Sequence, residues 1–421
     1  RTRMNRSLLL PGRAALALIL LPALACAGPD ESADRLTLDR AVEIALAGDD
    51  PAKTRHEARA EALEARAVAD AQLPDPMVTG QMANLPVDSF ALDEHAMTQI
   101  RFGVRQEFPP GRTLALRGDR QRSAAAAERA RARLTERDIA LSVREAWFDV
   151  AWHERAATII QASRDSVARQ VDSLSARFAT GRMNAQDVLR AELELALLDD
   201  ELAEHRRLVD RARAVLARWV GRSARDPLPA GWPMPASLPG HAALRARLVD
   251  HPAVAAEDAE IAAAEQTVAI ADEAYKPSIA VEGGYGVRTA FADFASVGVT
   301  LSVPLFADKR QDQRRRAAVE RRGAERFDRD ALLRELDRRL DQALSDWQRF
   351  NERLALYRDA LEARARQTAE ASVTTYASGR TDFAELIRSQ LAELDVALKR
   401  AELEAAAGKA WARIVYLTGE A

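Results

Sequence analysis

The sequence FATGRMNAQDVLR at residues 178–190 returns in related form as YASGRTDFAELIR at residues 376–388, which is 198 positions later. A repeat at such a spacing indicates that the fold is built from two copies of one structural unit. We therefore divide the chain into a first unit at residues 36–222 and a second unit at residues 241–421. The segment between them, residues 223–240, is rich in proline and is expected to be an extended linker.

Each copy of the repeated sequence predicts a tight turn between two helices. A glycine, Gly181 or Gly379, would end the first helix in the left-handed conformation. Asn184 and Asp382 would then cap the following helices, with Asp187 and Glu385 three residues further on, at the spacing of a capping box. A carboxylate in the first turn also complements the helix dipole. Capping alone could therefore explain both acidic residues, and a functional role stays open beside it.

The helices that lead into these turns are unusually long. Residues 112–177 and 309–375 contain no proline, and about 65 helical residues span on the order of 100 Å. Such a helix must pack along a partner of similar length, and heptads of apolar residues support this. They are Leu333, Leu340, Trp347, Leu354 and Leu361, then Val188, Leu195, Leu202, Val209 and Leu216, then Ile387, Leu394, Ala401, Gly408 and Val415. The spacing predicts antiparallel coiled-coil hairpins.

Two pairs of strands are expected between the shorter and the longer helices. They lie near residues 77–85 and 97–108 in the first unit, and near 279–288 and 296–303 in the second. Apolar and polar residues alternate in them, so one face should meet an apolar medium and the other should meet water. The candidates for the polar face are Arg101, Arg105, Glu107, Glu282 and Arg288. They could line a lumen, or they could simply be the solvated side of amphipathic strands.

The composition excludes several functional classes. With 61 basic and 64 acidic residues, the formal charge of −3 does not suit a nucleic-acid partner. A single cysteine excludes a disulfide framework. The sequence has no phosphate-binding loop, GxSxG or HExxH motif, so we expect neither an enzyme nor a cofactor. The six histidines lack the spacing of a metal site, and no metal ligands are predicted.

The first 25 residues are typical of an export signal, because arginines precede the apolar run at 14–25, which is too short to span a bilayer. Cleavage after Ala25 would place Cys26 first, as in a bacterial lipoprotein. An ordinary signal followed by an incidental cysteine remains the alternative. Beyond residue 26 no apolar run reaches membrane-helix length. Entry into a membrane would therefore require β-strands, and four strands close a barrel only when several chains combine.

The duplicated pattern, the two Ala-Thr/Ser-Gly-Arg turns and the strand pairs resemble the TolC-like outer-membrane efflux family over nearly the whole chain from about residue 36. The resemblance implies a mixed α and β membrane protein that forms a homotrimer. Its twelve-stranded outer-membrane β-barrel, with four strands per chain, would continue into a periplasmic α-helical barrel. It also implies the exit duct of a tripartite efflux pump in a Gram-negative bacterium, with outer-membrane lipid, a periplasmic adaptor (membrane fusion protein) and an inner-membrane RND-type pump as partners.

The resemblance also assigns roles to the repeated turns. Gly181, Arg182, Gly379 and Arg380 would form the tip that docks the adaptor. Glu385 matches the first member of an acidic ring that helps to hold the family's aperture closed and selects cations. The second acidic position is Arg388 here, which is a departure from the family pattern and predicts a constriction of mixed charge. Asp187 is the remaining gate candidate.

Three stretches of the first unit are similar to the heavy-metal branch of the family, which exports cobalt, zinc and cadmium or copper and silver. They are residues 73–77, 84–86 and 106–111. This similarity makes heavy-metal cations the expected substrate. A channel for multidrug efflux or type I protein secretion is the alternative within the family. A periplasmic coiled-coil adaptor or scaffold is the alternative of another class, although adaptors pair one hairpin with compact β-domains, whereas this chain has two hairpins and four strands.

Overall fold

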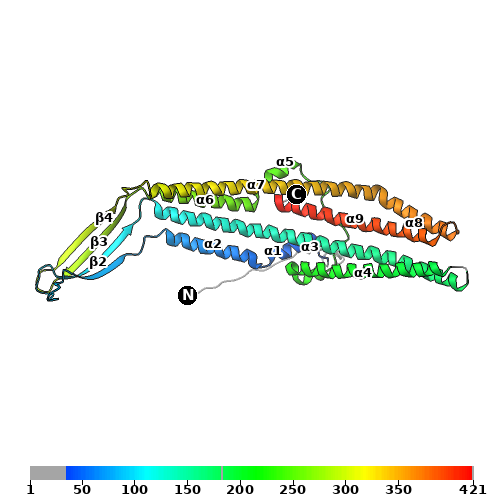
Figure 1. Ribbon diagram of the computed structural model, residues 1–421, viewed down its shortest axis with the longest axis horizontal. Coiled ribbons are helices and arrows are strands. Elements are labelled where there is room, and N and C mark those ends of the chain that lie inside the picture. The colour runs from blue at the N-terminus through cyan, green and yellow to red at the C-terminus, as the bar shows by residue number, and fades with distance from the viewer. Residues whose placement is uncertain (1–34, 182–183, 420–421) are drawn as a thin grey trace, which may run out of the picture.

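The computed structural model describes residues 35–181 and 184–419 of the chain. The molecule is long and narrow (Figure 1), with the strands at one end, the turns between the longest helices at the other, and the C-terminal end near the middle. The predicted signal at 1–25, Cys26 and Arg182 all lie outside the described residues. Among the residues that are described, none of the helices is both long enough and apolar enough to cross a membrane.

Both halves of the chain contain the same order of elements, and the sequence expectation of long hairpins and strand pairs agrees with this order. The first half contains α1 (Leu38–Ala47), α2 (Pro51–Asp70), β1 (Met77–Ala83), β2 (Gln99–Phe108), α3 (Thr113–Ala179) and α4 (Ala185–Val220). The second half contains α5 (His241–Ala246), α6 (Pro252–Glu273), β3 (Ser278–Val287), β4 (Phe294–Ser302), α7 (Gln311–Leu356), α8 (Glu362–Ala377) and α9 (Phe383–Thr418). Short 3₁₀ turns follow α4 and α5, at Gly221–Arg225 and Arg247–Asp250.

Two expected elements end or break earlier than the sequence suggested. The first strand ends at Ala83, because Asn84 adopts a positive φ of 55° that turns the chain. The long helix expected at 309–375 is interrupted by a π-helical turn at Tyr357–Leu361. A π turn shifts the residues that follow it around the helix axis, so the heptad pattern is not continued through it. Leu361, which was expected on the apolar seam, is accordingly not among the buried residues.

The four strands form one antiparallel sheet in the order β1-β2-β3-β4, so strands from both halves of the chain share it. Arg105 on β2 pairs with Glu282 on β3, and Glu282 pairs with Gly298 on β4. Since paired residues point to the same side of a sheet, these side chains occupy one polar face. The opposite face is apolar and exposed, and its side chains include Val78, Phe102, Val104, Val281, Val297 and Val299.

Helix α3 is the element against which most of the helical region is arranged. It packs along α2 and α6 in the part nearer the sheet, and along α4 and α9 in the part nearer the turns (Figure 1). In that second part Ile160, Val167 and Leu174 of α3 are buried against apolar residues of α4 and α9. The heptad residues Leu202, Ile387 and Leu394 belong to this cluster, which confirms the predicted hairpin seam.

A second apolar cluster lies near the middle of the molecule and fixes both the start of the described chain and the linker. Trp147 of α3 is fully buried, and its indole Nε1 donates to the carbonyl oxygen of Leu36 at 2.9 Å. The Phe148 ring stacks on Trp232 of the proline-rich segment at a centroid distance of 6.1 Å. Gly408 of α9 also faces this ring, because a Cβ on it would lie only 2.3 Å from Phe148. The absence of a side chain at Gly408 therefore permits the close approach of α9 to α3.

Candidate functional site: the helical tip and the polar face of the sheet

The two repeated turns lie at the same end of the molecule, where α3 passes into α4 and α8 into α9 (Figure 1). Gly181 and Gly379 have φ angles of +69° and +71°, and glycine adopts such angles without the steric cost that a Cβ would bring. The Gly379 amide donates to Tyr376 O at 3.0 Å, and the next amide, of Arg380, donates to Thr375 O at 2.9 Å. The expected glycine helix ends are therefore present, and Arg380 is exposed beyond the second of them.

Both returning helices are capped by the residues that the sequence indicated. Asn184 Oδ1 accepts from the amide of Gln186 at 3.1 Å, and Asp382 Oδ1 accepts from the amide of Glu385 at 2.9 Å. Each side chain satisfies an amide that the first helical turn leaves without a partner. The side chain of Glu385 does not turn back to complete a capping box. Its carboxylate is engaged elsewhere.

Glu385 and Arg388 form an ion pair on α9, with Arg388 Nη1 2.5 Å from Glu385 Oε2. The two side chains are 48% and 73% exposed, so solvent weakens the attraction between them. Even so, the carboxylate of Glu385 has a guanidinium of its own chain beside it. The two opposite charges that the sequence places here thus contact each other within one turn of the same helix.

Asp187 lies apart from that pair, in the first turn of α4. Burial raises the pKa of Tyr376 of α8, the positive charge of Arg177 lowers it, and the negative charge of Asp187 adds to the increase. The Tyr376 ring contacts Phe383 at a centroid distance of 5.9 Å, and Phe383 is almost fully buried. The structure therefore brings Glu385 and Arg388 together, whereas Asp187 lies on another helix, in the first turn of α4.

Four of the five residues expected on the polar face of the sheet do lie on it. Arg101 Nη2 donates to Ser296 Oγ on β4 at 3.1 Å, and Arg105 Nη1 lies 4.0 Å from Glu282 Oε2. Glu107 is exposed near the end of β2 and pairs with Ala280 in the register. These positions give the face charges of both signs side by side.

Arg288 is the residue that departs from this arrangement, because it lies just beyond the last residue of β3. Its guanidinium donates to the carbonyl oxygens of Ala96 and Ala292 and lies 3.7 Å from the centroid of the Phe294 ring. The side chain thus ties the two loops at this end of the sheet together. The alternating pattern predicted that Arg288 belongs to the strand, but β3 ends one residue earlier, at Val287.

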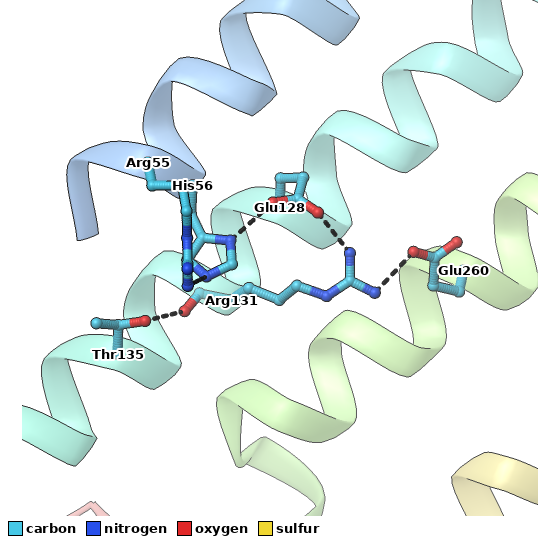
Figure 2. Close-up of polar contacts among 6 residues, drawn as sticks. All are labelled: Arg55, His56, Glu128, Arg131, Thr135 and Glu260. Atoms are coloured by element: carbon cyan, nitrogen blue, oxygen red, sulfur yellow. Dashed lines mark hydrogen bonds and ion pairs between the residues drawn. The ribbon is translucent and has the colours of Figure 1, made fainter. Parts of the chain in front are cut away.

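A charged cluster that no sequence motif indicates lies inside the helical region (Figure 2). Glu128 of α3 accepts from His56 Nδ1 of α2 at 2.7 Å and from Arg131 Nη1 at 2.7 Å, and Arg131 Nη2 reaches Glu260 of α6 at 2.9 Å. Burial raises the pKa of Glu128, but these hydrogen bonds outweigh it and keep the pKa below its ordinary value. The cluster joins three helices at positions that have no recognisable motif in the sequence.

No group of three or more histidine, cysteine or acidic side chains with metal-binding geometry occurs within residues 35–181 and 184–419. The rings of His153 and His205 lie near each other, with their centroids 5.6 Å apart.

The comparisons with known proteins agree with this architecture. The family model "Outer membrane efflux protein" matches residues 243–420. The cobalt-zinc-cadmium resistance protein CzcC of Cupriavidus metallidurans is 29% identical over 199 residues, which cover 42% of this chain and 46% of CzcC. The match therefore spans about half the length of that relative.

Two solved structures share the fold over nearly the whole chain. A membrane protein from Pseudomonas aeruginosa superposes with a TM-score of 0.77 at 17% identity, covering 91% of this chain and 92% of that one. The open state of the MtrE outer membrane channel of Neisseria gonorrhoeae gives a TM-score of 0.74 at 14% identity, covering 91% and 89%. At these identities the likeness establishes the fold.

Proposed function

We propose that the chain is an outer membrane efflux protein and forms the outer-membrane channel of a tripartite efflux pump, since its second half matches that family's model and part of it is similar to CzcC. The observation that carries the proposal is the sheet at the end of the long helical hairpins, which has one apolar face and one polar face. Such a sheet is suited to lipid on one side and to water on the other. The chain acts as a passive exit duct from the periplasm, with no chemical step of its own.

The proposed assembly is a homotrimer. β1 and β4 are the two outer strands of the sheet, and open sheet edges are not tolerated in a bilayer. Three copies joined edge to edge give a closed barrel of twelve strands, with the polar faces inside. The helical hairpins of the three copies, continued side by side, form the α-helical barrel beneath it. The repeat units at 36–222 and 241–421 each contribute two strands and one hairpin to this assembly.

The helical tip is the proposed docking site for a periplasmic adaptor, which in turn binds an inner-membrane RND-type pump. The turns at Gly181 and Gly379 are the parts of the hairpins that lie farthest from the sheet (Figure 1), and Arg380 is exposed there. Arg182, which the sequence assigns to the same surface, lies outside the described residues.

Heavy-metal cations are the proposed substrate. The support is the similarity to CzcC and the sequence stretches that resemble the heavy-metal branch. Multidrug efflux or protein secretion is the second candidate within the same architecture. The likeness to the solved MtrE channel extends over 91% of this chain. This extent disfavours the periplasmic adaptor or scaffold, which the sequence left open as an alternative.

The proposal is tested with the full chain produced in a Gram-negative host. We expect the protein in outer-membrane fractions, extracted only by detergent, as a trimer that forms channels in planar lipid bilayers. A monomer that stays freely in the periplasmic fraction would refute the channel. If the protein forms channels, but a host that also carries the pump genes gains no resistance to metals, the proposed duct stands and the metal substrate is refuted.

The gate role of Glu385 and Arg388 has its own test in single-channel recordings. Replacing Arg388→Gln removes the guanidinium that lies against Glu385, so we expect stronger block by divalent cations. Glu385→Ala should weaken that block. Glu402→Ala is the matched control, because Glu402 pairs with Lys399 at 2.7 Å with the same three-residue spacing on the same helix but far from the tip. Equal conductance and block in all three variants would exclude the gate role.

A further inference from the structure

Four polar side chains on the polar face of the sheet lean toward the next strand, and each of these four lies over a glycine of that strand. The glycines are on the polar face because Gly284 pairs with Ser296, Gly286 with Arg101, and Gly298 with Glu282. The four covering pairs are Thr79 (β1) over Gly103 (β2), Gln99 (β2) over Gly286 (β3), Arg101 (β2) over Gly284 (β3), and Glu282 (β3) over Gly298 (β4).

The space over these glycines is filled by the covering side chains. A Cβ on Gly298 would lie 2.7 Å from Glu282 Oε1, and a Cβ on Gly286 would lie 1.8 Å from Gln99 Oε1. Both distances are shorter than real Cβ contacts. The glycines are therefore required by the way these side chains lie, since any larger residue would push them off the sheet.

Arg101 illustrates the arrangement most clearly. Its side chain starts on β2, crosses β3 at Gly284, and ends with Nη2 at 3.1 Å from Ser296 Oγ on β4. A Cβ on Gly284 would lie 3.1 Å from Arg101 Nε and 2.8 Å from Ser296 Oγ. The guanidinium is thus held flat against the sheet along the width of two strands.

Glycines on the opposite, apolar face do not have this role. A Cβ on Gly283 would meet no atom within 4 Å, and one on Gly80 would meet the Phe102 ring at an ordinary 3.8 Å. The pattern also stops at β4, whose polar-face residues from Ser296 to Ser302 are short. No long side chain therefore extends beyond β4, toward the strand that a second copy would add.

We propose that the glycines of the polar face set the open width of the channel, by letting Arg101 and Glu282 lie along its wall. This inference rests on the proposed function, because it takes the polar face to be the lumen. A guanidinium or carboxylate that stood upright would narrow the lumen and place its charge in the path of the permeating ions. The glycines are positioning residues. They act on the permeating ions only through the orientation that they allow Arg101 and Glu282 to adopt.

The test compares Gly284→Ala and Gly298→Ala with Gly283→Ala in single-channel recordings from planar bilayers. Gly283 is the matched control, since it precedes Gly284 on the same strand and faces the other side. The atoms that a new Cβ would displace at 284 and 298 are mostly those of flexible side chains, so both variants should still assemble. We expect lower conductance in each of them and wild-type conductance in Gly283→Ala.

A second background separates orientation from general damage to the sheet. In an Arg101→Ser protein there is no guanidinium to lift, so adding Gly284→Ala should cost no further conductance. A loss that persists in that background would overturn the inference, and so would equal conductance of Gly284→Ala, Gly298→Ala and Gly283→Ala. Either of these two results would overturn this inference alone, because the wild-type protein would still form channels. A wild-type protein that forms no channels refutes the proposed function and this inference with it.

Discussion

His251 gives the helical region a dependence on pH that can be worked out from its contacts. The side chain is 1% exposed and caps α6, with Nδ1 accepting the amide of Ala253 at 3.2 Å. Because Nδ1 accepts, the neutral ring carries its proton on Nε2. Nε2 is buried and has no hydrogen-bond partner in the described part of the chain. A second proton would have to bind at Nδ1, and it would remove the acceptor that caps the helix.

The size of the effect follows from the shift in the pKa of His251. Burial, and then the positive charges of Arg137 and Arg339, lower this pKa from 6.5 to about 4. The unfolded chain therefore binds more protons than the folded chain between these values, and the free energy of unfolding decreases as the pH falls through this window. A shift of that size corresponds to at most about 3 kcal/mol per chain. The contribution is fully present above the unfolded pKa and is lost as the pH approaches 4.

The assay is the heat-unfolding midpoint in detergent, followed by far-ultraviolet circular dichroism at a series of pH values. His251→Asn is the control variant, because asparagine also caps helices but does not titrate. The raw curves include other groups, such as Asp138, whose pKa is raised by burial. The test is therefore the difference between the two proteins. We expect the wild type to lose stability relative to His251→Asn as the pH falls from about 6.5 to about 4. Parallel curves would refute the assignment of a buried, neutral His251.

Two further pairs of variants test the packing and the caps. Gly408→Ala places a Cβ 2.3 Å from the Phe148 ring and should destabilise the protein by about 1–3 kcal/mol through overpacking. Gly323→Ala on α7 meets nothing within 4 Å and should stabilise it by roughly 0.5–1 kcal/mol. If their heat-unfolding midpoints shift alike, the close approach of α9 to α3 is wrong. At the tip, Asp382→Ala should cost about 1 kcal/mol through loss of the helix cap, whereas Asp382→Asn should be nearly neutral. An equal loss in these two would show that the charge of Asp382, rather than its hydrogen bond to Glu385, matters.

Much of this fold follows from the sequence because the elements are long and strictly periodic. The heptads that include Leu202 and Leu394 predict the hairpins, and the alternation around Arg101 and Glu282 predicts the two faces of the sheet. The π turn at Tyr357–Leu361 could not be predicted in this way, because no local residue type requires it. The contacts of His56, Glu128, Arg131 and Glu260 depend on how far α2, α3 and α6 are shifted along their axes relative to one another. The periodicity of the sequence does not determine this shift.

The same limit applies to the glycines of the sheet. Alternation places Gly284 and Gly298 on the polar face, but only the side-chain positions in the folded sheet show that Arg101 and Glu282 lie over them. A glycine in a strand normally weakens it, so a sequence reading counts these residues against the strand. In the folded sheet, however, the missing Cβ at these glycines is what allows a long charged side chain to lie flat on a neighbouring strand.

Charges of opposite sign are paired at both ends of the molecule, and this pairing bears on what the duct can select. At the tip Arg388 lies against Glu385, and on the sheet Arg105 lies near Glu282. Paired charges produce a weaker electric field at a distance than unpaired ones. Salt screens that field further, over a length of about 10 Å. A lumen lined in this way would hold neither cations nor anions strongly, so that ions entering from the pump would also leave. Discrimination between substrates then has to occur before the duct, at the inner-membrane pump and adaptor that we propose as its partners.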